Sequence, residues 1–233
     1  MTGADRFEAM GTSHLAMIGI CLVGLPLMVL LGRLARAHPQ PVARGFALVL
    51  VAAVLPLQVL DHLPGNFQLG VSLPLQLCDL AALVAVIALW TRNHTAICVT
   101  YLWGLLLTPQ ALVTPALAAD FPDPRFVVFW AMHILVVWAA VFLTFGLGHR
   151  PDWSGYRRTV ALTATWMLVL YPLNLLLGTN YGFVNGKPGT GSLLDLLGPW
   201  PVYLAVEVVI VALVWALMTW PWTRRPAPVT TTD

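Results

Sequence analysis

Seven long runs of apolar residues constrain the fold of this chain more than any other feature. They cover residues 13–31, 46–60, 73–90, 96–113, 126–147, 159–177 and 199–220. A helix of about 20 apolar residues crosses the hydrocarbon core of a bilayer. Charged residues make up only 9% of the chain, against about 25% in soluble domains. The sequence therefore predicts an all-α fold: a polytopic membrane bundle of seven transmembrane helices in one domain at residues 1–225, with a disordered tail at 226–233.

The charges between these runs alternate from one connection to the next. Nine arginines follow the first, third, fifth and seventh runs: Arg33, Arg36, Arg44, Arg92, Arg150, Arg157, Arg158, Arg224 and Arg225. The other segments hold Arg6, Arg125 and Lys187 together with most of the acidic residues. Cytoplasmic loops of membrane proteins are enriched in basic residues. We therefore expect a multi-pass protein of the cell membrane, with its N-terminus outside and its C-terminus in the cytoplasm.

Polar residues within the apolar runs gather toward the outer ends of the predicted helices. They are Cys78 and Asp79 in the third run, Gln110 in the fourth, His133 in the fifth, Asn174 in the sixth and Glu207 in the seventh. Ionisable residues inside a membrane are costly and are commonly functional. Their shared depth predicts one polar cavity that opens toward the outer leaflet. Amides such as Asn174 also serve simply to join neighbouring helices, and that interpretation stays open here.

The start of the third run is the most informative stretch. Pro74 is tolerated in a first helical turn, so we expect a helix from about residue 73, with Cys78 and Asp79 in its second turn. Gln76 and Asp79 then share one face. Adjacent residues lie about 100° apart on a helix, so Cys78 and Asp79 cannot point at the same spot. A buried cysteine is often only a packing residue, which is the alternative to a reactive Cys78.

A long glycine-rich connection at residues 178–198 separates the last two runs. It contains Asn180 and Asp195, and Tyr203 follows in the last run. We expect these residues, together with Gln76, to bind or orient the substrate. Connections between helices of a bundle are usually shorter. We therefore expect this segment to fold over the cavity as a lid, with Trp200 and Tyr203 beneath it.

Several short motifs together resemble a known family. They are LPLQLCD at 73–79, WGL at 103–105, TPQA at 108–111, His133, GTNY at 178–181 and LDLLGPWP at 194–201. In order and spacing they resemble the YwaF-like integral membrane proteins of bacteria. The arginine bias of the chain, in which Lys187 is the only lysine, is also typical of a GC-rich bacterial genome.

The resemblance implies a chemistry. An animal relative of this family is a cysteine-dependent acyltransferase that moves a fatty acyl group between phospholipids. By that resemblance Cys78 is the acyl-accepting nucleophile and His133 its base. Physical reasoning adds Asp79 or Glu207 to orient the imidazole, and amides such as Asn174 or Gln110 to stabilise an oxyanion. We expect a thiol-dependent acyltransferase or acyl hydrolase whose substrate is a membrane phospholipid, with no cofactor, metal or nucleic-acid partner.

Two other classes of protein fit parts of this pattern. A small-solute or ion-coupled transporter would use the same intramembrane polar residues, although apolar inner halves argue against a continuous path. A structural subunit would tolerate Cys78→Ala. A metal site built from His14, His62, His133 and Cys78 lacks the HExxH or HxxxH spacing that such sites often use.

Overall fold

The computed structural model describes residues 6–189 and 192–224. The predicted tail at 226–233 lies outside the described residues, as does Arg225. The α-helices are α1 (Thr12–Leu34), α2 (Pro39–His62), α3 (Leu77–Thr91), α4 (His94–Leu102), α5 (Thr108–Val113), α6 (Pro124–Val141), α7 (Trp153–Leu177) and α8 (Val202–Thr223). Within the described residues there is no β-strand, and the one isolated bridge joins Arg6 to Ala119. The predicted all-α fold is confirmed.

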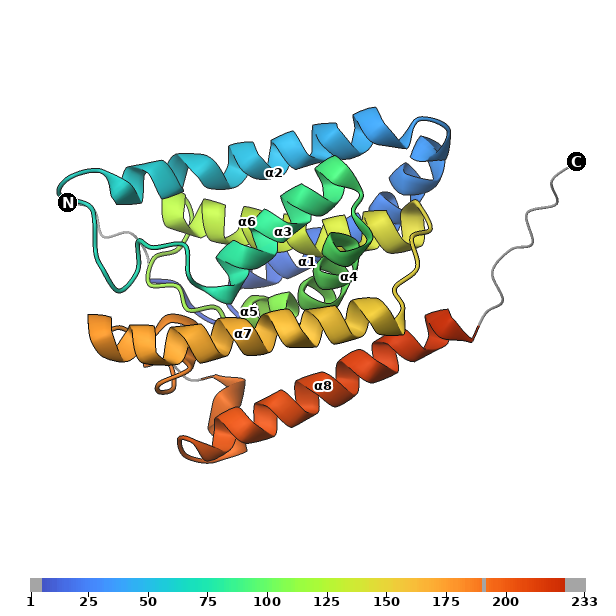
Figure 1. Cartoon of the computed structure of the whole chain (residues 1–233). Helices are drawn as coiled ribbons and strands as arrows, with labels where there is room; N and C mark the ends of the chain where they lie inside the picture. The colour runs from blue at the N-terminus through green and yellow to red at the C-terminus, as the bar shows by residue number, and fades with distance from the viewer. Residues whose placement is uncertain (1–5, 190–191, 225–233) are drawn as a thin grey trace, which may run out of the picture.

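The helices form one bundle whose axes run roughly along a common direction (Figure 1). Helix α2 borders one side of this view and α8 the other, with α3, α4 and α6 between them. In the described part of the chain, six helical segments are long and apolar enough to cross a membrane. The third predicted span corresponds to α3, which has only 15 residues. A multi-pass membrane protein is thus supported, and α3 as a seventh span stays a prediction.

Helix α3 begins at Leu77, four residues later than the sequence analysis expected. The Asp79 carboxylate accepts the backbone N–H of Gln76 (3.1 Å), which satisfies a donor that has no partner within the helix. The preceding residues form turns and bends, with Gln76 extended, and Pro74 lies in that segment rather than in the first helical turn. Cys78 is consequently the second residue of α3 and lies in its first turn. Figure 1 shows that α3 starts well inside the ends of α2 and α7.

Side chains from elsewhere in the chain bind the backbone of this irregular entry to α3. The Leu73 N–H donates to the Tyr181 hydroxyl (3.1 Å), and Trp166 Nε1 donates to the Leu75 carbonyl (3.2 Å). Irregular backbone at membrane depth is tolerated where protein surrounds it and supplies such partners. The entry to α3 is therefore held in place by side chains of the bundle interior.

Two helices contain a π-helical turn. The turn η2 (Trp103–Leu107) joins α4 to α5, and η3 (Phe142–Gly146) extends α6. Pro109 lies at the start of α5 and has no N–H to donate, which accounts for the wider turn just before it. Despite Pro109, the helix stays continuous through η2 into α5.

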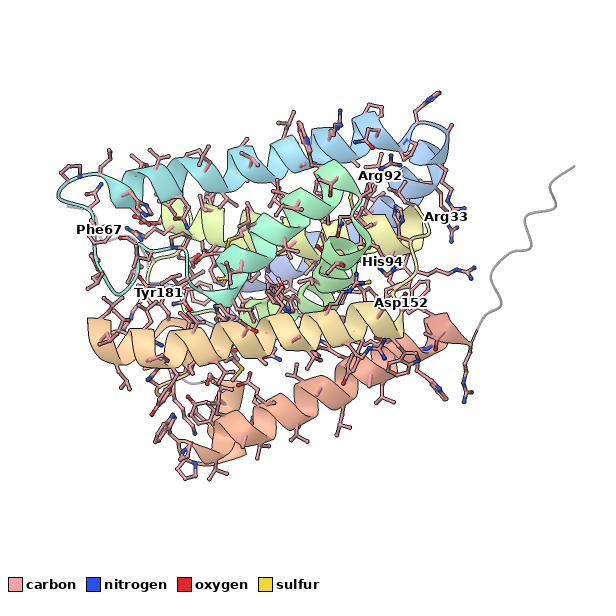
Figure 2. The ribbon with its side chains drawn as sticks, viewed as in Figure 1. Arg33, Phe67, Arg92, His94, Asp152 and Tyr181 are labelled. Atoms are coloured by element: carbon pink, nitrogen blue, oxygen red, sulfur yellow. The ribbon has the colours of Figure 1, made fainter. Side chains whose placement is uncertain are left out.

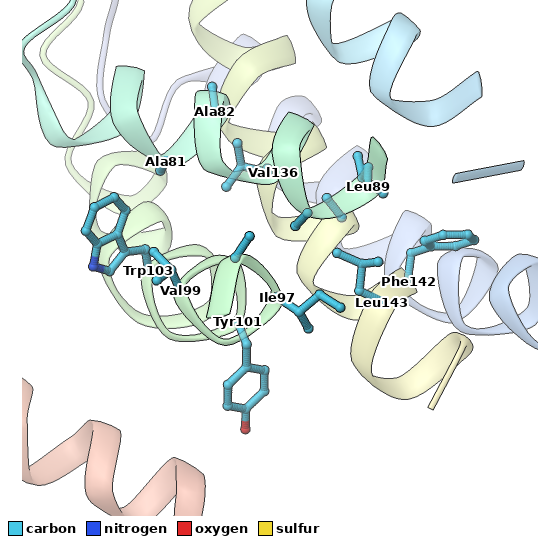
Figure 3. Packing of buried hydrophobic residues seen from close by; sticks show 14 of the residues in the cluster. Ala81, Ala82, Leu89, Ile97, Val99, Tyr101, Trp103, Val136, Phe142 and Leu143 are labelled. Carbon is cyan, nitrogen blue, oxygen red and sulfur yellow. The ribbon is translucent and has the colours of Figure 1, made fainter. Parts of the chain in front are cut away.

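Helix α3 packs closely against its neighbours in the interior of the bundle. Ala81, Ala85 and Ala88 recur at helical spacing and are almost fully buried. Their small side chains let α3 approach the neighbouring helices α4 and α6, as the packing near Val99 and Val136 shows (Figure 3). By contrast, leucines on the outer faces of α1, α7 and α8 are exposed, as expected of helices that contact lipid.

Helix α1 crosses η3 through a pair of glycines. A Cβ atom at Gly32 would lie 2.5 Å from the Gly146 Cα, so the two backbones approach too closely for any side chain. We expect Gly32→Val to lower the free energy of unfolding by about 1–3 kcal/mol through overpacking. Denaturant unfolding in detergent measures this. Gly19→Val on the same helix is the matched control, because a Cβ there meets nothing within 4 Å; equal stability of the two variants would contradict the prediction.

The two ends of the bundle differ in charge. Figure 2 shows Arg33 and Arg92 at one end, and Phe67 and Tyr181 at the other. Arg33 and Arg92, which follow the first and third apolar runs, thus lie at the same end of the bundle. Which end faces the cytoplasm stays a prediction.

Candidate functional site

A cavity of about 900 Å³ opens among α2, α3, α5, α6, α7 and α8. Most of its lining side chains are apolar, and a few polar ones converge on it, as in many sites for small molecules. Six of the residues that the sequence analysis selected line this cavity: Gln76, Cys78, Asp79, Gln110, His133 and Glu207. They come from four helices and from the entry to α3, so tertiary packing brings them together.

His133 lies on α6 and is 2% exposed. Its Nδ1 is 2.7 Å from the carbonyl oxygen of Phe129, one turn earlier. A carbonyl can only accept, so Nδ1 carries the hydrogen and Nε2 keeps its lone pair in the neutral ring. The Phe129 ring also packs against the imidazole, with ring centroids 4.1 Å apart. The structure thus holds one tautomer, in which Nε2 can accept a proton.

The sequence predicts that Asp79 or Glu207 orients this imidazole. In the structure the partner of Nδ1 is the Phe129 carbonyl instead, so a carboxylate is not what sets the tautomer. The sequence contains a signal for this arrangement: Phe129 and His133 are four residues apart, and a side chain at that spacing can reach back to the earlier carbonyl.

Cys78 is half-buried at the second position of α3 and faces the same cavity as His133. All three cysteines are free, and Cys21 and Cys98 lie away from this lining. No hydrogen bond joins Cys78 to His133 among the described residues. A base and its proton donor often lie farther apart in an empty site than in the reacting complex. Cys78 is accordingly the thiol that lines this cavity together with a histidine.

Asp79 and Gln76 both serve the start of α3. Besides accepting from Gln76 N–H, Asp79 accepts a long hydrogen bond from Gln58 Nε2 (3.5 Å). The side-chain oxygen of Gln76 accepts the backbone N–H of Gly182 (2.9 Å). Gln76 therefore attaches the connection after α7 to α3, and Asp79 caps the helix that carries Cys78.

Asn174 is buried and fully hydrogen-bonded. Its Nδ2 donates to the Tyr181 carbonyl (3.0 Å) and to Asn185 Oδ1 (2.8 Å). Its Oδ1 accepts from Thr179 Oγ1 (2.9 Å) and from the Tyr181 N–H (2.9 Å). Asn174 does not line the cavity. The structure thus uses this amide to shape the following connection, which agrees with the structural alternative that the sequence left open for Asn174 rather than with the oxyanion role.

Three further predicted residues also hold that connection. Asn180 donates to the Gly186 carbonyl (2.8 Å). The Tyr203 hydroxyl donates to the Phe183 carbonyl. Asp195 accepts the Ser192 N–H (2.9 Å) and lies 3.4 Å from Lys187 Nζ, and these contacts lower the pKa of its carboxyl group. The chain between them forms part of the cavity wall through residues such as Gly182 and Val184.

Gln110 and Glu207 are the predicted cavity residues whose side-chain polar groups remain available to a bound molecule. Among the described residues, neither side chain has a hydrogen-bonding partner. Gln110 is on α5, and Glu207 is on the second turn of α8. Gln110 offers two N–H donors and a carbonyl acceptor, and Glu207 offers a carboxyl group. They are the side chains best placed to contact a bound molecule.

An ion pair lies at the rim of the cavity. The Arg125 guanidinium contacts the Asp61 carboxylate at 2.7 Å, and both residues belong to the lining. The sequence analysis treated Arg125 only as a loop charge because it precedes the fifth apolar run. Its place at the rim depends on the start of α6 lying beside the end of α2.

A second, apolar groove of about 570 Å³ runs between α2 and α3. It shares Val54, Gln58 and Asp79 with the main cavity. Leu83 lines the groove and is 56% exposed on the outer face of α3. The long Gln58–Asp79 hydrogen bond therefore lies between the cavity and a groove that opens toward lipid.

Fold and cavity together define a multi-pass helical membrane protein with a mainly apolar internal site. A family model confirms this class: the chain belongs to the TMEM164 family, whose model matches residues 9–219. The match includes all the cavity residues named above. No curated protein and no solved structure matches the chain.

Proposed function

We propose that this protein is a thiol-dependent acyltransferase or acyl hydrolase that acts on a lipid ester. Cys78 is the nucleophile and His133 is its base. The observation that carries the proposal is the shared cavity, which Cys78 lines together with a histidine whose Nε2 is held as a proton acceptor. The resemblance to YwaF-like proteins and to their animal acyltransferase relative points to the same two residues.

The proposed reaction proceeds through a thioester. His133 Nε2 takes the Cys78 proton as the sulfur attacks the ester carbonyl, and the imidazolium then protonates the departing lysolipid alkoxide. The acyl group is now on Cys78. An alcohol or a water molecule gives its proton to the same Nε2 as it attacks the thioester, and the imidazolium then protonates the departing Cys78 thiolate. The Gln110 amide is the available donor for the oxyanion of either tetrahedral intermediate.

The shape of the site suits a phospholipid substrate. The apolar lining accommodates acyl chains, and the groove between α2 and α3 supplies a lateral route from the bilayer. Arg125 at the rim provides a cation near the expected position of a lipid phosphate. No cofactor is needed for this chemistry, since nucleophile and base are both side chains.

The proposal also assigns a place in the cell. We put the protein in the cell membrane, with its N-terminus outside and with α3 as a partial seventh span. The grouping of Arg33 and Arg92 at one end of the bundle supports this orientation (Figure 2). The cavity rim at Asp61 and Arg125 then lies near the outer leaflet.

Mass spectrometry of the purified protein tests the function. After incubation with phospholipid vesicles, we expect an acyl mass on the Cys78 peptide that hydroxylamine removes. Cys21 and Cys98 act as internal controls, and their peptides are expected to stay unmodified. An unmodified Cys78 in protein shown to be folded would overturn the acyl-transfer proposal, and the cavity would then be tested for solute transport.

A further inference from the structure

A second cluster of chemically reactive side chains lies at the opposite end of the bundle. It comprises His94 and Cys98 on α4 and Asp152 at the start of α7. One ligand atom from each residue lies within 4.8 Å of the other two. Figure 2 shows His94 and Asp152 together near Arg92, far from Tyr181. We propose that these three residues form a zinc-binding site that joins the start of α4 to the start of α7.

The distances suit a single small cation. His94 Nε2 lies 3.8 Å from Cys98 Sγ and 3.8 Å from Asp152 Oδ2. Around a tetrahedral zinc ion with bonds of about 2.0–2.3 Å, neighbouring ligand atoms are about 3.3–3.6 Å apart. Small side-chain rotations therefore bring all three atoms into coordination. Three protein ligands leave the fourth position of the metal to water.

The local backbone already orients the ligands. Asn93 caps α4 by accepting the Ala96 N–H (3.1 Å), which places His94 and Cys98 one turn apart on the same face. Asp152 caps α7 through Oδ1, which accepts the Gly155 N–H (2.7 Å). Its other oxygen, Oδ2, is the one near His94. Cys98 packs directly against Gly155, where any larger residue would overlap its sulfur.

The chemistry of the donor set favours zinc over harder cations. A thiolate and an imidazole are preferred zinc ligands, whereas calcium and magnesium take oxygen ligands. On binding, the Cys98 thiol releases its proton to solvent. One thiolate and one carboxylate then balance the two positive charges of the ion. A neutral site is the least costly kind at the edge of a membrane-embedded bundle.

Cobalt titration of the full-length protein in detergent tests this site, because Co²⁺ bound to a thiolate absorbs in the near ultraviolet. We expect one equivalent of Co²⁺ to develop this band and Zn²⁺ to displace it. Cys98→Ser is expected to abolish the band. Asp152→Asn keeps a good N-cap but removes the charged metal ligand. Changes around metal ligands typically weaken metal binding about 10- to 100-fold, and we expect this variant to weaken Co²⁺ binding by more than that.

Cys21→Ser is the matched control, since Cys21 is a buried thiol outside the cluster. The Co²⁺ absorption band and the Co²⁺ affinity of Cys21→Ser are expected to equal those of the unaltered protein. Zn²⁺ is also expected to raise the thermal midpoint of the unaltered protein and not that of Asp152→Asn. Absence of the band, or a band that persists in Cys98→Ser, would overturn the site. These readouts do not depend on acyl transfer.

Discussion

His133→Gln is expected to slow acylation of Cys78 at least about 100-fold, the lower range for loss of a general base. Glutamine keeps a polar side chain of similar reach but has no lone pair able to take a proton near neutral pH. The structure supplies the reason for a large effect: the Phe129 carbonyl holds Nδ1 (2.7 Å), so Nε2 is the nitrogen left to accept the thiol proton. The rate of hydroxylamine-sensitive labelling of Cys78 measures this change in the acylation rate.

His62→Gln is the matched control for this variant. The His62 ring makes the same kind of contact, from Nδ1 to the Gln58 carbonyl four residues earlier (2.7 Å), but at the exposed end of α2. Its acylation rate is expected to stay near that of the unaltered protein. Labelling of His133→Gln at the unaltered rate would remove His133 from the mechanism.

Asn174→Leu is expected to lower the free energy of unfolding by about 2–6 kcal/mol, because two buried backbone groups would lose their partners at about 1–3 kcal/mol each. These groups are the N–H and the carbonyl of Tyr181, which is fully buried. The connection that Asn174 holds also supplies the Gly182 N–H to Gln76. We therefore expect faster hydrogen exchange across residues 179–186 as well as lower stability in denaturant.

Leu175→Ala provides the comparison for that variant. Leu175 is the next residue of α7 and is 64% exposed on its outer face. Its replacement is expected to leave exchange in the connection unchanged. If Asn174→Leu kept the same exchange and the same unfolding curve as Leu175→Ala, the buried hydrogen bonds would not organise this wall of the cavity.

Much of the candidate site was accessible from the sequence because rare polar residues in apolar runs are conspicuous. Cys78, His133, Gln110 and Glu207 were selected in this way, and they line one cavity. Asn174 was conspicuous for the same reason but has a different role. Rarity in a membrane helix identifies a residue that must find partners. It does not distinguish partners within the protein from a substrate.

The sequence by itself determined the class of protein and most of the helices. Hydropathy acts locally, since each apolar segment gains free energy from leaving water whatever its neighbours are. The caps Asn93, Asp123 and Asp152 are local as well, and each accepts a backbone N–H two or three residues later. Most helix boundaries in the structure accordingly fall near the ends of the apolar runs, but α2 and α7 begin at Pro39 and Trp153, well before the runs that start at 46 and 159.

The tertiary structure alone decided where α3 begins and what surrounds Cys78. The entry to α3 depends on Tyr181 and Trp166, which lie about a hundred residues further along the chain than the backbone groups they bind. The joining of α4 to α7 through His94, Cys98 and Asp152 likewise requires two distant segments to meet. Hydrogen bonds and metal ligands act over a few ångströms, so only the packed bundle defines these partners.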